Sequence, residues 1–236
     1  MISLASFHYY LMSYRKYITV ITMAYQKTTL HNKIFETLRD RILHMDYSPG
    51  MGLTEKDLCG EFKVSRTPLR EAIRKLEEMK LVTVIPRFGT YVSSIDINEI
   101  RCAFEVKIKL EGLAGELAAR RITSDKLEEM RRLIGDADRI LREGGHRGLI
   151  GLDARFHEII YLATQNSILQ EFLENLHSRC ARLWGSSLSE IIPTEEVLEQ
   201  LRGIHQALQE REVKRTGQLM EAHVQYFIER IKMQLL

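Results

Sequence analysis

A carboxylate and three imidazoles in the C-terminal half of the chain could together bind a divalent metal ion. Asp153 and His157 are four residues apart, so a helix would place both side chains on one face. His205 and His223 each lie on an apolar stripe of a later helical segment. This donor set leaves coordination positions open and suits Zn²⁺, Ni²⁺ or Mn²⁺ together with an exogenous ligand. A lone histidine on an apolar face is more often a core residue, and this packing role is the alternative for His205.

A second group of residues has the chemistry needed to bind DNA. Arg66, Arg70 and Arg74 recur every four residues on one face of a predicted helix that begins after Ser65. Free N–H groups and the dipole attract phosphate to the N-terminus of a helix. Hydroxyl groups beside arginines at such an end are typical of a recognition helix in the DNA major groove. A surface helix with solvated arginines is the alternative if this stretch is considered alone.

The segments before this helix favour the DNA-binding interpretation. Residues 54–62 predict a short helix that Thr54 can cap, and the Lys63-Val64 turn leads from it into Ser65. Two helices across a tight turn form a helix-turn-helix pattern. Further upstream, residues 29–44 carry apolar side chains at helical spacing and predict a helix that packs behind the recognition helix.

The segment after the recognition helix predicts a β-hairpin. Residues 81–85 and 90–93 are rich in β-branched and aromatic side chains, and the loop between them carries Arg87 and Gly89. A hairpin directly after a recognition helix is a wing. Because glycine has no Cβ, Gly89 would let the backbone approach a phosphate or the minor groove closely.

The remaining residues, 96–236, show helical periodicity and no strong strand pattern, so the fold class is mainly α. We predict helices near residues 97–120, 124–143, 147–163, 167–188, 194–210 and 214–235. Asp96 or Asn98 can cap the first of them, and Gly144-Gly145 is expected to interrupt the second and third. Helices of this length predict an antiparallel bundle with its own core.

Composition and charge agree with a DNA-binding N-terminal segment followed by a helical bundle. The chain of 236 residues is 44% hydrophobic and 28% charged, with a net charge of +2, which suits a globular protein without a strongly basic surface. Residues 27–95 contain 12 basic and 9 acidic side chains, whereas residues 96–236 have an excess of acidic over basic side chains. A basic front would orient residues 27–95 toward DNA and make the affinity sensitive to salt.

Other features bear on the cellular location of the chain. The three widely spaced cysteines predict buried free thiols in a reduced, cytoplasmic protein. We find no apolar run long enough for a transmembrane helix and expect no membrane partner.

We expect residues 1–26 to be a disordered extension or the product of a mis-assigned start codon, with an arm packed on the body as the alternative.

The N-terminal motifs resemble the winged helix-turn-helix domain of GntR-family bacterial transcription regulators. The resemblance rests on residues 53–58, 64–72, 76–77, 81–82 and 87–92. It implies that DNA phosphates and bases contact Lys56, Ser65, Arg66, Thr67 and Arg70, and that Gly89 enters the minor groove.

The C-terminal half resembles the all-helical ligand-binding domain, called FCD, of the FadR branch of that family. The matching segments are residues 109–114, 117–120, 153–157, 163–166, 207–209 and 220–223. The resemblance implies a small organic-acid effector. In metal-binding members it also implies an aspartate, a histidine four residues later, and histidines on the fifth and sixth helices.

This sequence departs from the family pattern at the third ligand. Counting back from His223, that ligand falls at Leu201, whereas His205 lies one helical turn later. The helix is therefore shifted by a turn, or a water replaces the ligand, or the site is metal-free. Lys107 stands where many members carry an arginine that could pair with an effector carboxylate, although it could also be a surface residue. Asn166 could hydrogen-bond the effector or cap the next helix.

Together these features predict a DNA-binding transcription regulator that binds a pseudo-palindromic operator as a homodimer and responds to an effector. One alternative is a metal-dependent enzyme built on the helical bundle. Against it, His157-Glu158 is not part of a His-Glu-x-x-His motif, and no convincing catalytic triad is present in the sequence. A second alternative is a DNA-binding dimer without an effector.

Overall fold

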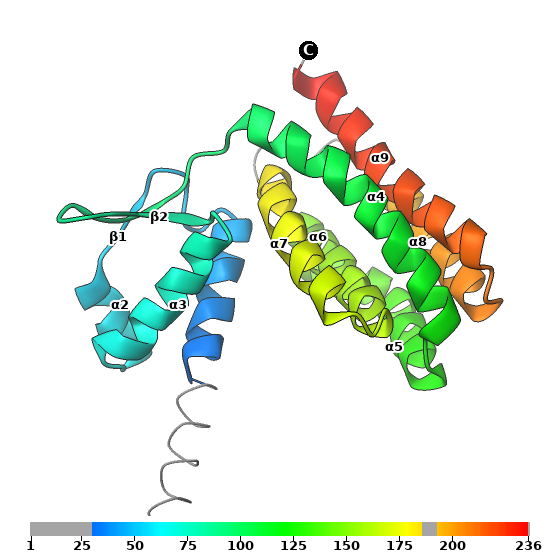
Figure 1. Cartoon of the computed structure of the whole chain (residues 1–236), viewed down its shortest axis with the longest axis horizontal. Coiled ribbons are helices and arrows are strands. Elements are labelled where there is room, and N and C mark those ends of the chain that lie inside the picture. The colour runs from blue at the N-terminus through cyan, green and yellow to red at the C-terminus, as the bar shows by residue number, and fades with distance from the viewer. Residues whose placement is uncertain (1–29, 186–192, 236) are drawn as a thin grey trace, which may run out of the picture. The chain divides into compact units, whose positions relative to one another are not determined.

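The computed structural model describes residues 30–185 and 193–235 (Figure 1). The expected N-terminal extension, residues 1–26, lies outside the described residues. The described chain forms two compact units. One combines residues up to Arg41 with Gly50–Ser93, and the other combines Ile42–Pro49 with the residues from Ser94 onward.

The first unit is a winged helix-turn-helix. A helix over residues 30–43 is followed by β1 (Gly52–Leu53), α2 (Glu55–Phe62), α3 (Arg66–Glu78), β2 (Val82–Ile85) and β3 (Gly89–Val92). The predicted hairpin is confirmed as β2 and β3, which pair antiparallel with Val84 opposite Thr90. The sequence did not predict β1, which pairs antiparallel with β3 and makes the sheet three-stranded, in the order β1-β3-β2.

Local chemistry explains where the recognition helix α3 begins and which face it buries. Lys63 adopts a left-handed conformation, with φ 53°, and ends α2, so the chain can turn before α3. Ser65 is the N-cap residue of α3, as predicted, although its side chain makes no capping hydrogen bond within the described part of the chain. The buried face of α3 consists of Pro68, Leu69, Ala72, Ile73 and Leu76. The arginines therefore lie on the solvent-exposed face.

The second unit is a helical bundle. Its helices are α4 (Ile97–Arg121), α5 (Ser124–Gly135), α6 (Ala137–Ala163), α7 (Ser167–Gly185), α8 (Thr194–Gln209) and α9 (Val213–Leu235). Asp96 caps α4, as predicted, by accepting hydrogen bonds from the N–H groups of Asn98 and Glu99. The core includes Phe156, Ile160, Leu201, Ile204 and Met220. No helix in the described ranges is both long and apolar enough to cross a membrane.

The predicted boundary between the second and third bundle helices was wrong. α5 already ends at Gly135, and Asp136 stands between it and α6. Gly145 does interrupt helical geometry, but it does so as a kink inside α6, with φ 53° and ψ −134°. Glycine reaches this conformation without the steric cost of a Cβ, so the chain resumes the helix directly after the kink.

Helices α4 and α9 lie side by side along their length (Figure 1) and carry several of the polar residues described below. Their close approach depends on glycine. A Cβ at Gly115 would lie 2.9 Å from both Met220 Cγ and the backbone oxygen of Thr216. Because a backbone atom cannot move aside cheaply, any larger residue at position 115 would push the two helices apart.

Gly115→Ala should therefore destabilise the chain by roughly 1–3 kcal/mol, the usual cost of overpacking, measured by chemical denaturation. Gly203→Ala in α8 is the matched control, because nothing lies within 4 Å of the added Cβ. That change should be neutral or stabilise by up to about 1 kcal/mol through helix propensity. Equal effects of both substitutions would contradict the close-packing explanation.

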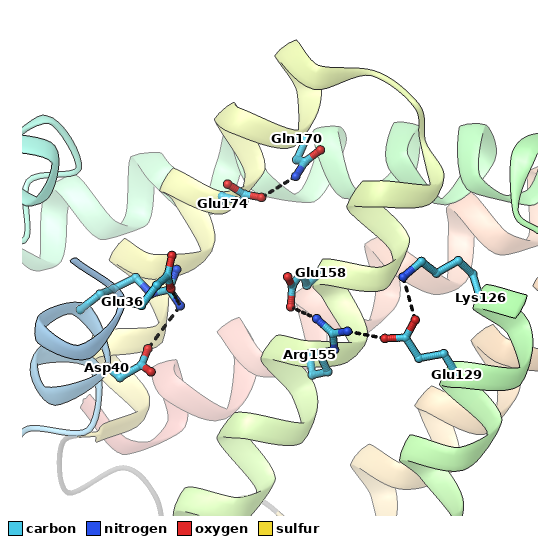
Figure 2. Close-up of polar contacts among 9 residues, drawn as sticks. Glu36, Asp40, Lys126, Glu129, Arg155, Glu158, Gln170 and Glu174 are labelled. Atoms are coloured by element: carbon cyan, nitrogen blue, oxygen red, sulfur yellow. Dashed lines mark hydrogen bonds and ion pairs between the residues drawn. The ribbon is translucent and has the colours of Figure 1, made fainter. Parts of the chain in front are cut away.

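The outer face of α6 is tied to α5 by exposed ion pairs. Figure 2 shows Arg155 between Glu129 of α5 and Glu158 of α6, with Glu129 also accepting from Lys126 at 2.7 Å. Each exposed pair contributes little free energy by itself, although a shared arginine limits the ways in which the two helices can pack. The opposite face of α6 carries buried Phe156 and the histidine of the candidate metal centre.

Candidate metal centre and DNA-binding surface

Three of the predicted metal ligands lie together inside the bundle. Asp153 and His157 come from α6 and His223 comes from α9, and their donor atoms lie within 4.8 Å of one another. His223 Nε2 is 3.0 Å from Asp153 Oδ1, and His157 Nε2 is 3.8 Å from Asp153 Oδ2. Only 2% of His157 and 1% of His223 are exposed. One carboxylate and two imidazoles around one point are a suitable partial ligand set for a divalent ion.

The other nitrogen of each imidazole faces an oxygen acceptor outside this group. His157 Nδ1 is 3.1 Å from Oε1 of Glu111, which lies on α4. His223 Nδ1 is 2.8 Å from Gln200 Oε1 on α8. A ring that donates its Nδ1 hydrogen has its lone pair on Nε2, and in both rings Nε2 faces Asp153. Glu111 and Gln200 thus orient both histidines for coordination at one point.

The contacts of His223 are those expected of a ring that coordinates a metal ion. Burial lowers the pKa of His223, so the ring is neutral near pH 7 and carries one hydrogen. Yet both nitrogens face acceptor oxygens, of Gln200 and Asp153, and a neutral ring can donate to only one. A metal ion at Nε2 would satisfy the ring and the carboxylate together. Without a cation, the Gln200 amide must reverse so that its N–H group donates to Nδ1.

The Asp153 carboxyl is ionised despite its surroundings. Burial opposes ionisation, but the nearby His157 and His223 rings outweigh it and hold the pKa of Asp153 well below its usual range. The carboxylate is therefore available as an anionic ligand at neutral pH.

A second donor group, Glu111, His157 and His177, shares His157 with the first. Here a cation is already present, because the Lys107 ammonium forms an ion pair with Glu111 and both side chains are almost fully buried. The Tyr161 hydroxyl also donates to Glu111, at 2.5 Å. Burial, then the nearby charge of Lys107, lowers the pKa of His177 to about 3. Lys107 thus makes this group less favourable for a metal ion than the Asp153 group.

The structure does not bring His205 or Asn166 into either group. His205 Nε2 lies 3.1 Å from the backbone oxygen of Leu127 on α5. Leu201, at the position of the family's third ligand, is fully buried in the core. Asn166 Oδ1 accepts a hydrogen bond from the N–H group of Leu169, so it caps α7. Lys107, by contrast, is only 4% exposed and is not a surface residue.

Sequence reasoning missed four polar residues of this cluster. Glu111 lies four residues after Lys107, and Tyr161 lies four residues after His157, so helical spacing from known candidates could have found both. Gln200 and His177 come from α8 and α7, and no local motif connects either residue with the predicted ligands.

The winged unit exposes the residues predicted to contact DNA. Lys56, Ser65, Arg66 and Thr67 are all exposed. Arg70 is exposed as well, but its guanidinium forms a bidentate pair with Glu55 of α2, with Nε 2.8 Å from Oε1 and Nη2 3.0 Å from Oε2. The hydrogen bond from Arg70 holds the pKa of the Glu55 carboxyl below its usual range.

The tip of the wing combines charge with an unusual backbone. The Phe88 N–H group donates to the Ile85 oxygen at 3.0 Å and closes a turn in which Arg87 has φ 70°. That position of the turn is normally filled by glycine or asparagine, because other side chains are strained there. Gly89 follows with φ 131°, and Phe88 between them is 79% exposed. The turn therefore presents Arg87 and Phe88 to solvent at some cost in backbone strain.

Comparisons with known proteins agree with both units. The family model "Bacterial regulatory proteins, gntR family" matches residues 30–92, and the "FCD domain" model matches residues 102–226. The HTH-type transcriptional repressor RspR of Escherichia coli is 27% identical over 215 residues, covering 91% of this chain and 94% of the relative. An uncharacterised HTH-type regulator of Bacillus subtilis, YdhC, is 25% identical, covering 87% and 92% respectively.

Solved structures show the same fold. Escherichia coli McbR/YncC superposes with a TM-score of 0.77 at 22% identity, covering 88% of this chain and 99% of that chain. A GntR regulator from Rhodococcus superposes with a TM-score of 0.68 at 20% identity, covering 86% and 97%. The chain belongs to the GntR family of bacterial transcription regulators and carries an FCD domain in its C-terminal half.

Proposed function

We propose that this regulator binds a two-fold symmetric operator as a homodimer and that a divalent metal ion and a small organic acid bound in the bundle alter its affinity for DNA. The observation that carries the effector part is the orientation of two buried imidazoles toward one carboxylate. Such convergence of buried ionisable groups on one point is typical of a ligand site rather than of a packed core.

Asp153, His157 and His223 would hold the metal ion, with Glu111 and Gln200 positioning the two rings. When bound, the ion supplies coordination positions that an oxygen donor of an effector can fill. Lys107 lies beside the same cluster, so an effector carboxylate would compete with Glu111 for its ammonium. Because Lys107 and Glu111 both belong to α4, which directly follows the link to the winged unit, this competition offers a route from effector to DNA-binding unit.

The DNA-binding part rests on α3 and the wing. Ser65, Arg66, Thr67 and Arg70 lie at or near the N-terminal end of α3, where free N–H groups and the helix dipole attract phosphate. Lys56 of α2 and Arg87 of the wing add exposed positive charge on the elements that precede and follow α3 in the chain, and Gly89 of the wing lets the backbone come close to DNA. One such helix buries too little surface for tight specific binding, so a homodimer on two half-sites is the expected arrangement.

Selection of duplexes from a random pool with the full-length chain tests this proposal. The expected result is enrichment of a two-fold symmetric motif, and added Zn²⁺ with a panel of small carboxylic acids should change the affinity for it. An enriched motif without symmetry, bound by a protein that sediments as a monomer, would contradict the dimer. No enrichment under any condition would contradict the DNA-binding proposal itself.

The strained turn of the wing gives a prediction with two opposite effects. Arg87→Gly relieves the left-handed strain and should stabilise the chain by roughly 0.5–1 kcal/mol in chemical denaturation. It should nevertheless weaken DNA binding and reduce the salt slope by about 0.9, the value for one phosphate contact. Titrations by fluorescence anisotropy at several salt concentrations measure the second effect.

Lys80→Gly is the matched control for Arg87→Gly. Lys80 also has a positive φ, of 60°, and also carries one positive charge, but it follows the C-terminal end of α3. Its replacement should stabilise the chain without changing the salt slope. If both substitutions weaken DNA binding equally, Arg87 acts only through the net charge of the protein and not through a phosphate contact of its own.

A further inference from the structure

The arginines on the exposed face of α3 are not equivalent in the structure. Arg70 is held by Glu55 through two hydrogen bonds, of 2.8 and 3.0 Å. Arg66 makes no hydrogen bond or ion pair with any residue in the described ranges, although its charge contributes to the lowered pKa of Glu55. Both side chains are exposed and both belong to the first two turns of α3. The difference between them is therefore the carboxylate of Glu55.

The contact with Glu55 uses only one edge of the Arg70 guanidinium. Nε and Nη2 donate to the two carboxylate oxygens, which accounts for two of the five N–H groups. The Nη1–Nη2 edge still has donors on both nitrogens. Two donors side by side match the O6 and N7 acceptors that guanine presents in the major groove.

The pairing also changes the free-energy terms of DNA binding. A side chain that is already fixed loses less conformational entropy when it meets a base. The pair has no net charge, so it gains little from phosphates at any sequence, and non-specific binding is mostly phosphate attraction. Both effects favour discrimination between bases over affinity for DNA in general.

We infer that Glu55 is a specificity-determining positioning residue, which buttresses Arg70 so that its free Nη1–Nη2 edge reads a guanine in the major groove. This inference rests on the proposed DNA-binding function. Arg70 touches the base, and Glu55 acts through Arg70.

The test compares Glu55→Gln with the wild-type full-length chain on two DNA probes. One probe is a duplex enriched from a random pool by the wild-type chain, and the other is a scrambled duplex of the same composition. Glu55→Gln should bind the scrambled duplex more tightly, with a salt slope about 0.9 steeper, since the Arg70 charge becomes available to phosphate. The ratio of specific to non-specific affinity should fall about tenfold, as expected for loss of one base contact.

Glu61→Gln is the matched control, because Glu61 lies on the same helix and pairs with a different arginine, Arg41. It changes the net charge by the same amount but should leave the affinity ratio unchanged. If both variants change the ratio equally, Glu55 acts only as a background charge and the inference is wrong. Circular dichroism of both variants establishes that they are folded.

Substitution of Arg70 itself completes the test. Arg70→Ala should remove the preference for guanine at one position of the enriched motif, and Glu55→Gln should add nothing further in that background. A full additional loss of discrimination in the double variant would overturn the inference. Failure of the wild-type chain to enrich any duplex would instead contradict the proposed function, so the two failures are distinguishable.

Discussion

The wild-type chain should melt roughly 5–10 °C higher when Zn²⁺ is present at a hundredfold excess over its Kd, whereas the His223→Ala variant should show almost no shift. A ligand at this excess adds about 2.7 kcal/mol to the free energy of unfolding, and a chain of this size gains a few degrees per kcal/mol. His157→Ala should behave like His223→Ala, because each removes one of two imidazoles. Elemental analysis of protein purified without affinity-resin metal measures the same loss directly.

His205→Ala is the control for the two ligand variants. His205 contacts the backbone of Leu127 and not the candidate metal centre, so its replacement should leave the Zn²⁺-dependent shift intact. A loss equal to that of His223→Ala would show that the bound state uses a different register of α8. If Zn²⁺, Ni²⁺ and Mn²⁺ all leave the melting temperature of the wild-type chain unchanged, the metal proposal is wrong.

Glu111→Ala should destabilise the chain by roughly 3–5 kcal/mol, the usual effect of leaving a buried charge without its partner. The charge that would be left is the Lys107 ammonium, which is as buried as the carboxylate that neutralises it. Tyr161 and His157 would also lose an acceptor. Chemical denaturation in the absence of metal measures this effect apart from any loss of Zn²⁺ binding.

A double variant, Lys107→Met with Glu111→Leu, separates charge from packing. Replacing both members of a buried pair with apolar residues is often neutral, so this variant should recover much of the stability lost in Glu111→Ala. Recovery should be incomplete because Tyr161 and His157 still lack an acceptor. No recovery at all would mean that the loss in Glu111→Ala does not come from the unpaired charge of Lys107.

The same pair predicts the direction of acid sensitivity. Burial raises the pKa of Glu111, but His157 and Lys107 together outweigh it and hold the pKa below its usual range. The stability that this carboxylate contributes is therefore present above the unfolded-state pKa of about 4.3 and is lost as the pH falls below it. The double variant should lose less stability than the wild-type chain between about pH 5 and pH 2.

Sequence patterns predicted the elements better than the site. The periodicity of α3 and the β-branched hairpin depend on neighbours along the chain, and both are confirmed. β1 was missed because two residues carry no periodic signal, and its pairing with β3 depends on a distant segment. The end of α5 was missed because Gly144-Gly145 offered a stronger local signal than Gly135.

In the candidate metal centre, too, contacts within one helix could be predicted and contacts between helices could not. Asp153 and His157 share a helix, so their spacing alone brings them together. His177 and Gln200 reach the cluster from other helices, and their positions depend on how those helices pack. His205 was misleading because both Leu201 and His205 lie on an apolar stripe, and only the packed bundle shows that Leu201 is in the core.

The N-cap of α3 has a consequence for the way in which DNA is held. Ser65 leaves the first N–H groups of the helix without a side-chain acceptor within the described part of the chain. In the free protein these groups are left to water. A phosphate placed against them would supply the missing acceptor. DNA would then act as the capping group of its own recognition helix.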